Sequence, residues 1–242
     1  MVRPRQRFNS VVLKLSGEPF CTKAGPRIDP DELELVPREI KSSVDFVRRL
    51  AVVVGGGNII RGARLAEAGQ IPRATADYMG MLGTVINGVA LKEMLGSLGQ
   101  PSRCMTAIDI PAVAEPFIRG RALRHQEKGA VVILAGGTGN PFFTTDTCAA
   151  LRATELECDV VLKATKVDGV YDADPKSNPN ARRYESLTFA AAISKRLAVM
   201  DMTALAMCQE QNLPVIVFDF KKQGNIRKAI EGEPIGTLIH NG

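Results

Sequence analysis

The 242-residue sequence contains no tryptophan and only two histidines, His125 and His240. So few histidines exclude a histidine-rich metal centre and a catalytic triad that depends on a histidine base. The five cysteines are odd in number and form no Cys-x-x-Cys pair, which favours free thiols in a reducing compartment over a disulfide framework or a zinc site. No apolar run reaches the length of a membrane span, so we expect a cytoplasmic protein with no membrane partner.

Two common nucleotide-binding signatures are also missing. The chain has no G-x-x-x-x-G-K-[ST] sequence, and no G-x-G-x-x-G sequence follows a strand-like run. The net charge of +5 suits an enzyme for polyanionic substrates. However, the 31 basic residues are mixed with 26 acidic ones and form no block with interleaved aromatics, so we expect no nucleic-acid partner. These absences leave a phosphate-handling site of another design.

Short apolar runs rich in β-branched residues recur along the chain at residues 10–15, 50–54, 130–134, 159–162 and 215–218. They are uniformly apolar, as strands covered on both faces are. Helical patterns lie between them. One begins with Pro37 at its first position and continues to Val47, and a longer one spans residues 76–98. We therefore predict one α/β domain, a three-layer αβα sandwich around a mostly parallel sheet.

Three glycines interrupt the longer helical pattern, at Gly80, Gly83 and Gly88. Each lowers intrinsic helix stability by about 1 kcal/mol. They indicate close packing of this helix against a neighbour, with another subunit as one candidate.

Glycine-containing turns follow three of the predicted strands. The most informative covers residues 136–146 (GGTGNPFFTTD) and leads into a helix that begins near Asp146; the others are residues 14–17 (KLSG) and residues 55–58 (GGGN), the latter followed by Arg61. Free N–H groups, hydroxyls and a helix dipole at such turns attract anions. The alternatives are an ordinary strand-to-helix turn for the first and a solvated strand-end lysine for Lys14.

The character of the chain changes near Lys163, where residues 168–175 (DGVYDADP) read as a tight turn and an Asp/Pro-rich loop. We interpret this change as the junction between two halves of the single domain. Residues 9–162 are expected to hold one ligand, and residues 163–242 another.

Taken together, residues 14–17, 55–61, 138–146 and 163–175 resemble the amino-acid-kinase family and, within it, the bacterial uridylate (UMP) kinases. The resemblance covers about residues 9–239. It implies a cytoplasmic homohexamer that transfers a phosphoryl group from ATP to UMP in pyrimidine nucleotide synthesis. It also implies Mg²⁺, held mainly through the ATP phosphates and water, and feedback inhibition by UTP. The alternatives are a kinase for a carboxylate or carbamate acceptor and a non-catalytic nucleotide-binding or storage protein.

The resemblance assigns roles residue by residue. Catalytic roles fall on Lys14, Arg61, Asp146 and Asp201. ATP-binding roles fall on Lys14, Leu15, Ser16, Gly17, Gly57, Arg61, Thr165, Tyr171 and Asp174. UMP-binding roles fall on Gly56, Asp77, Thr138, Gly139, Asn140, Pro141, Phe142, Phe143, Thr144 and Thr145. Two alternatives stay open: Asp77 at a helix start serves the helix dipole equally well, and Asp201 equally well serves as a helix N-cap.

One segment departs from the family pattern. Many members are activated by GTP at a subunit interface, through a loop that ends in Gly-Phe-Gly before an Ile-Asp pair. Here residues 25–27 (GPR) precede Ile28 and Asp29. Proline lacks a backbone donor and arginine is strained at positive φ, although Arg27 offers a new phosphate contact. We expect weak or absent activation by GTP, with inhibition by UTP retained because UTP can occupy the UMP site.

Overall fold

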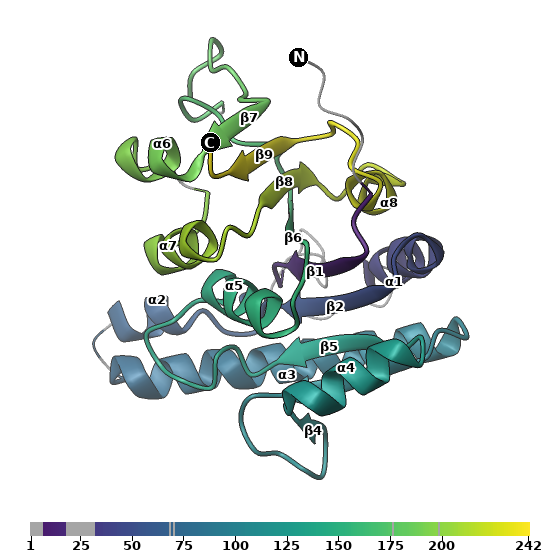
Figure 1. Cartoon of the computed structure of the whole chain (residues 1–242). Coiled ribbons are helices and arrows are strands. Elements are labelled where there is room, and N and C mark those ends of the chain that lie inside the picture. Colours follow the sequence, from purple (N-terminus) through teal and green to yellow (C-terminus); the bar gives the residue numbers. More distant parts are fainter. Residues whose placement is uncertain (1–6, 18–31, 68, 70, 176, 198) are drawn as a thin grey trace.

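The computed structural model describes residues 7–242 apart from residues 18–31, 68, 70, 176 and 198 (Figure 1). Its centre is a nine-stranded sheet in the order β4-β3-β5-β2-β1-β6-β8-β9-β7. The strands are β1 (Ser10–Leu15), β2 (Arg49–Val54), β3 (Ser102–Thr106), β4 (Glu115–Pro116), β5 (Val131–Ala135), β6 (Val160–Thr165), β7 (Ser186–Thr188), β8 (Val215–Asp219) and β9 (Thr237–His240). All neighbouring pairs are parallel except β8 and β9, which confirms the predicted mostly parallel sheet.

Helices cover both faces of this sheet. They are α1 (Glu32–Ser43), the 3-10 turn η2 (Val44–Phe46), α2 (Gly62–Glu67), α3 (Arg73–Ser97), α4 (Arg119–Glu127), α5 (Thr145–Glu155), α6 (Phe189–Ser194), α7 (Met202–Glu210) and α8 (Asn225–Ile230). Helices α1, α3 and α8 pack into one apolar core, and α4 to α7 into the other. The predicted three-layer αβα sandwich is therefore confirmed. Among the described residues, no helix is both long and apolar enough to cross a membrane.

Successive side chains of the central strand β1 point to opposite faces of the sheet, and both faces are covered by an apolar core, so the strand is apolar throughout. In β1, Val11, Leu13 and Leu15 face the first core, whereas Val12 faces the second, and all four are fully buried. All five predicted strands are found at the expected places. Strands β3, β4, β7 and β9 were not predicted, because β4, β7 and β9 contain four residues or fewer and β3 (SRCMT) mixes polar with apolar residues.

The helix predictions have mixed outcomes. The longer pattern is confirmed as α3, which begins at Arg73 and ends at Ser97. The prediction that Pro37 opens a helix is wrong, because Pro37 lies inside α1 and the helix ends at Ser43. Proline in a helix interior removes one backbone hydrogen bond. Burial of Val36 and Ile40 in the first core offsets that cost.

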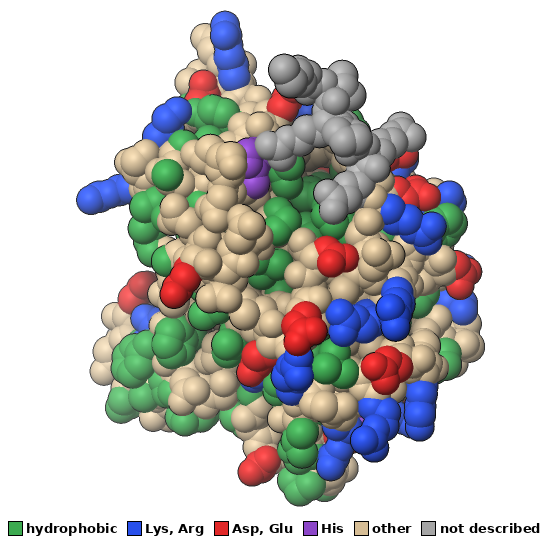
Figure 2. Space-filling model, in the orientation of Figure 1, with side chains coloured by type: hydrophobic (Ala, Val, Ile, Leu, Met, Phe, Trp, Pro, Cys, Tyr) green, Lys and Arg blue, Asp and Glu red, His purple; other side chains and the backbone are tan. Residues whose placement is uncertain are grey.

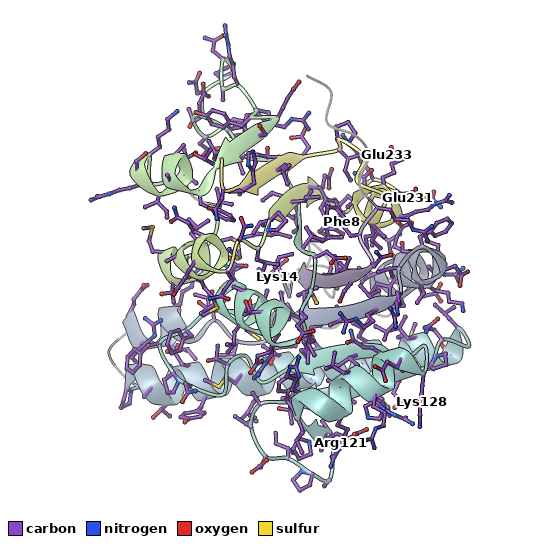
Figure 3. All side chains as sticks on the ribbon, viewed as in Figure 1. Phe8, Lys14, Arg121, Lys128, Glu231 and Glu233 are labelled. Carbon is purple, nitrogen blue, oxygen red and sulfur yellow. The ribbon has the colours of Figure 1, made fainter. Side chains whose placement is uncertain are left out.

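Parallel strands bring their carboxyl ends to one edge of the sheet. In the register of β1, Lys14 lies beside Val53 of β2 on one side and beside Lys163 of β6 on the other. Figure 3 shows Lys14 in the middle of the molecule, at the end of β1. The glycine-containing turns after β1, β2 and β5 therefore leave the sheet at the same edge.

Candidate functional site

A cleft of about 280 Å³ opens at this carboxyl edge. It is formed by the three glycine-containing turns together with the first half of α3. Of the predicted site residues, the cleft is lined by Lys14, Ser16, Gly17, Gly56, Gly57, Arg61, Asp77, Thr138, Asn140, Phe143, Thr144 and Thr145. Segments that are far apart in sequence thus converge on one hollow.

Two lysines share one carboxylate behind the cleft. Lys14 Nζ lies 2.8 Å from Asp146 Oδ1, and Lys163 Nζ lies 2.6 Å from Asp146 Oδ2. Lys163 also donates to the backbone carbonyl of Val199. Asp146 occupies the first turn of α5, so one helix carries the carboxylate and two neighbouring strands carry the ammonium groups.

The pKa values of Asp146 and Lys163 both depart from their ordinary values. Burial disfavours the charged form of Asp146, but Lys14 and Lys163 outweigh it and hold the pKa of the carboxyl below its ordinary value. Burial lowers the pKa of the Lys163 ammonium group, and Lys14 acts in the same direction while Asp146 opposes both. In this geometry one carboxylate contacts two lysine side chains, so the cluster has more basic than acidic groups and suits an anionic ligand.

Lys163 received no role in the sequence analysis. The available signal was its place within the apolar run of β6, since a lysine on a buried strand is rarely tolerated unless it is paired. Its partner, Asp146, lies 17 residues away in sequence, and sequence pattern alone does not show which carboxylate a buried lysine meets.

The glycine loop of residues 55–58 packs directly onto α3. A Cβ atom added to Gly56 would lie 2.7 Å from both the carbonyl oxygen of Gly80 and the backbone nitrogen of Thr84. Within the part of the chain that the structure describes, the N–H groups of Gly56 and Gly57 have no protein acceptor. Arg61, just before α2, donates from Nε to the carbonyl of Gly57 at 3.2 Å. The loop therefore offers two backbone donors and a nearby guanidinium to an anion.

The glycines of α3 pack mainly against the chain itself. A Cβ atom on Gly83 would lie 3.2 Å from the carbonyl oxygen of Gly56, and one on Gly88 would lie 3.1 Å from Cys104 Sγ. One on Gly80 would meet nothing within 4 Å. The prediction of close packing against a neighbour is confirmed for Gly83 and Gly88, whose close neighbours belong to the same chain, and packing against another subunit stays a prediction.

The loop after β5 contains a strained residue and a helix cap. Phe142 adopts φ of 71° without being a glycine, and its side chain is 68% exposed. The hydroxyl oxygen of Thr144 accepts the N–H of Asp146 at 3.0 Å, which caps α5. The prediction that a helix begins near Asp146 is confirmed. Gly139, Pro141 and Phe142 do not line the cleft.

Asp77 ties helix α3 to this loop. It is the fifth residue of α3, and both its carboxylate oxygens accept from Arg73 Nε at 2.9 Å. Its Oδ2 also accepts the N–H of Phe142 at 2.9 Å. Asp77 therefore contacts the loop and lines the cleft in addition to lying near the start of α3, and its role toward UMP stays a prediction.

Asp201 caps α7 and also holds α5. Its Oδ1 accepts the N–H of Ala204 at 2.9 Å, as an N-cap does. Its Oδ2 accepts the hydroxyls of Thr144 at 2.5 Å and Thr147 at 2.8 Å. Asp201 does not line the cleft, so the N-capping alternative is confirmed and a catalytic role remains a prediction.

The remaining predicted residues lie outside the cleft. Leu15 is fully buried in the first core. Thr165 ends β6 and donates to the carbonyl of Val167 at 2.6 Å, and the hydroxyl of Tyr171 donates to Asp168 at 2.7 Å. The carbonyl of Asp174 accepts the N–H of Asn178 at 2.9 Å. Thr165, Tyr171 and Asp174 lie in the second half of the chain, and their assignment to ATP binding rests on the resemblance alone.

Comparison with known proteins agrees with this arrangement. Residues 9–219 match the model of the amino acid kinase family. The chloroplastic uridylate kinase PUMPKIN of Arabidopsis thaliana is 52% identical over 237 residues, which cover 98% of this chain and 70% of that protein. The solved UMP kinase of Bacillus anthracis matches with a TM-score of 0.93 at 41% identity, covering 98% of this chain and 97% of that one. The UMP kinase of Ureaplasma parvum gives 0.90 at 37% identity, covering 98% and 100%. The chain belongs to the amino acid kinase family.

Proposed function

We propose that this protein transfers the γ-phosphoryl group of ATP to UMP, giving ADP and UDP for pyrimidine nucleotide synthesis. The observation that carries the proposal is the pair Lys14 and Lys163 on one carboxylate, at the point where three glycine-containing turns meet. The names of the similar proteins, all uridylate or UMP kinases, support the choice of acceptor.

The chemistry requires positioning and positive charge. Phosphoryl transfer needs two polyanions held in line and charge stabilisation on the moving group. Lys14 lines the cleft and supplies that charge, and the N–H groups of Gly56 and Gly57 face the phosphates of UMP and ATP respectively. Neither histidine lines the cleft, and Asp77 and Asp146 are both tied to cationic side chains. The described lining therefore offers no base to make a covalent nucleophile, and transfer is direct.

Each half of the chain holds one nucleotide in this proposal. Asp77 binds the ribose of UMP, and the loop of residues 138–145 encloses its uracil and phosphate, with Phe143 as an apolar wall of the cleft. Residues 163–242 hold the adenosine of ATP through Thr165, Tyr171 and Asp174. A carboxylate or carbamate acceptor has no need of so long a threonine- and phenylalanine-containing loop, which argues against the rival kinase.

Magnesium fits this site only as an ion that binds together with ATP. Among the described residues, no group of three or more His, Cys, Asp or Glu side chains converges to hold a metal. Asp146 is engaged by two lysines, so the ion takes its ligands from the ATP phosphates and water. When bound, Mg²⁺ supplies further neutralisation of phosphate charge.

Self-association into a homohexamer belongs to the same proposal. Tyr78, Leu82 and Ile86 lie one turn apart on α3, and each side chain is at least 45% exposed. Figure 2 shows hydrophobic side chains gathered over α2 and the first half of α3. An apolar stripe of this kind favours burial against a second copy of the chain. Feedback inhibition by UTP and a cytoplasmic location complete the proposal.

A coupled assay for ADP formation tests the function. The purified protein is given MgATP with UMP, CMP, dTMP, AMP or GMP, and separately with aspartate or glutamate. The proposal expects UMP to give the highest kcat/KM and the amino acids to give none. ADP formation that depends on a carboxylate acceptor, or no ADP formation with any acceptor, would overturn it.

A further inference from the structure

Two buried asparagines lie beneath the glycine loop. Asn58 ends the loop and is 4% exposed, whereas Asn87 lies on α3 and is 0% exposed. Their side-chain amides pair reciprocally. Asn58 Nδ2 donates to Asn87 Oδ1 at 3.2 Å, and Asn87 Nδ2 donates to Asn58 Oδ1 at 2.7 Å. Neither residue has a place in the proposed chemistry.

Asn87 also fixes the backbone of the loop. Its Nδ2 donates a second bond, at 2.7 Å, to the carbonyl oxygen of Gly55. Three consecutive glycines have little conformational preference of their own, so a loop built from them needs outside contacts to keep one shape. With the Gly55 carbonyl drawn toward α3, the N–H groups of Gly56 and Gly57 find no acceptor among the described residues, and both glycines line the cleft.

The turn after β1 packs against the same asparagine pair. A Cβ atom added to Gly17 would lie 2.2 Å from Asn58 Oδ1 and 2.8 Å from the backbone nitrogen of Gly57. Gly17 follows Lys14 by three residues, so the asparagine pair touches two of the three turns that form the cleft.

We propose that Asn87, acting through Asn58 and Gly55, is a positioning residue for phosphoryl transfer. The buried pair holds the glycine loop in the one shape that aims the N–H groups of Gly56 and Gly57 at the two phosphates. This inference rests on the proposed function. The plain alternative is that the pair contributes only to stability, as most buried hydrogen-bonded amides do.

A matched pair of variants distinguishes the positioning role of Asn87 from a role in stability alone. Asn87→Ala removes the bonds to the loop. Leu91→Ala removes a side chain that is also 0% exposed, four residues later on α3, but that packs in the first core. Both are assayed well below their melting temperatures. Misplacement of reacting groups by about 1 Å costs on the order of 10²-fold in rate. We expect kcat/KM for both nucleotides to fall at least about 10-fold in Asn87→Ala and to stay near wild type in Leu91→Ala.

A readout without activity keeps the test independent of the proposed function. Amide hydrogen exchange in residues 55–58 should be faster in Asn87→Ala than in Leu91→Ala. If the wild-type protein does not phosphorylate UMP, the proposed function fails and this exchange measurement still decides the role of the pair. If Asn87→Ala does not fold, Asn58→Ala removes the same pair from the loop side. Equal kinetics and equal loop exchange in the asparagine and leucine variants would overturn the inference.

Discussion

At the scale of single residues, one carboxylate lies between two lysines at the centre of the site. Asp146 holds Lys14 at the cleft wall and Lys163 behind it. Such a buried group is costly unless every charge is paired, so each member constrains the other two. The arrangement leaves Lys14 oriented toward the cleft before any ligand binds.

Replacing Lys14 tests its part in the transfer. Lys14→Ala should lower kcat by about 10²-fold or more, because its charge matters most as the phosphoryl group moves, while UMP affinity changes much less. Steady-state kinetics and UMP titration measure the two quantities. Lys128→Ala is a suitable control, since Lys128 is exposed and lies at the end of α4, far from Lys14 (Figure 3). Near-normal turnover in Lys14→Ala would remove it from the mechanism.

Asp146 should also shape the acid stability of the fold. Its folded pKa lies below the ordinary value of 3.8, so its ionised form stabilises the fold above that pH. This contribution is lost as pH falls through the folded pKa. The melting temperature of the wild type should therefore fall more steeply below about pH 4 than that of Asp146→Asn. Calorimetry from pH 7 to pH 2 measures both proteins, and parallel curves would contradict the pairing.

At neutral pH the same variant should be much less stable than the wild type. Asp146→Asn leaves two buried ammonium groups without a counter-ion, a change that typically costs about 3–5 kcal/mol. Adding Lys163→Met to Asp146→Asn removes one of the unpaired charges and should restore part of the lost free energy of unfolding.

Asp77 gives a prediction about one substrate only. Asp77→Ala should raise KM for UMP on the order of 10-fold or more, because a hydrogen bond to a charged group is worth about 1.5–3 kcal/mol. KM for ATP should hardly change. The loss of the contact to the N–H of Phe142 adds to the effect on the loop that encloses UMP. Equal effects on both substrates, or a general loss of thermal stability, would favour a structural role.

At the scale of elements, α3 connects the turns that form the cleft. Asp77 accepts the N–H of Phe142, the hydroxyl oxygen of Thr84 accepts the N–H of Gly136 at 2.7 Å, and Asn87 donates to Gly55. One helix therefore fixes the glycine loop and the loop after β5 relative to each other. The 3.6-residue spacing of apolar residues predicted the helix. It did not predict these contacts, because they are made by polar side chains, which do not contribute to the apolar pattern.

Gly56 tests the close approach of loop and helix. Gly56→Ala places a methyl group 2.7 Å from backbone atoms of α3, so the loop must move. We expect a lower melting temperature and a loss of activity on the order of 10²-fold. Gly96→Ala is the matched control within α3: its Cβ atom would meet nothing within 4 Å, and alanine stabilises a helix by about 1 kcal/mol relative to glycine. Full activity in Gly56→Ala would contradict the packing.

The sequence predicted the elements whose signal is local. Uniformly apolar runs located the five central strands, and the glycine turns at their ends located the cleft. Lys163 and Asn87 were missed because their partners lie far away in sequence, and a pairing of that kind is decided by the fold. Pro37 was misplaced because burial of Val36 and Ile40 overrides a local preference for the first helical position.

At the scale of the whole molecule, the prediction about regulation by GTP concerns a segment outside the described residues. Residues 25–27, which differ from the family pattern, lie in that segment, so the expected weak activation by GTP stays a prediction. Initial rates at subsaturating UMP, with and without GTP, should show weak or no activation, because Pro26 and Arg27 replace more permissive residues. UTP should still inhibit. A several-fold stimulation by GTP would show that Arg27 supplies the missing contact.

In the proposed reaction the cleft moves a phosphoryl group directly from ATP to UMP. ATP made chiral at the γ-phosphorus with oxygen isotopes follows that group itself. We expect the label to appear in UDP with inverted configuration at phosphorus, as a single in-line transfer requires. Retention of configuration would reveal a covalent intermediate on the protein, and label found only in inorganic phosphate would contradict transfer to UMP.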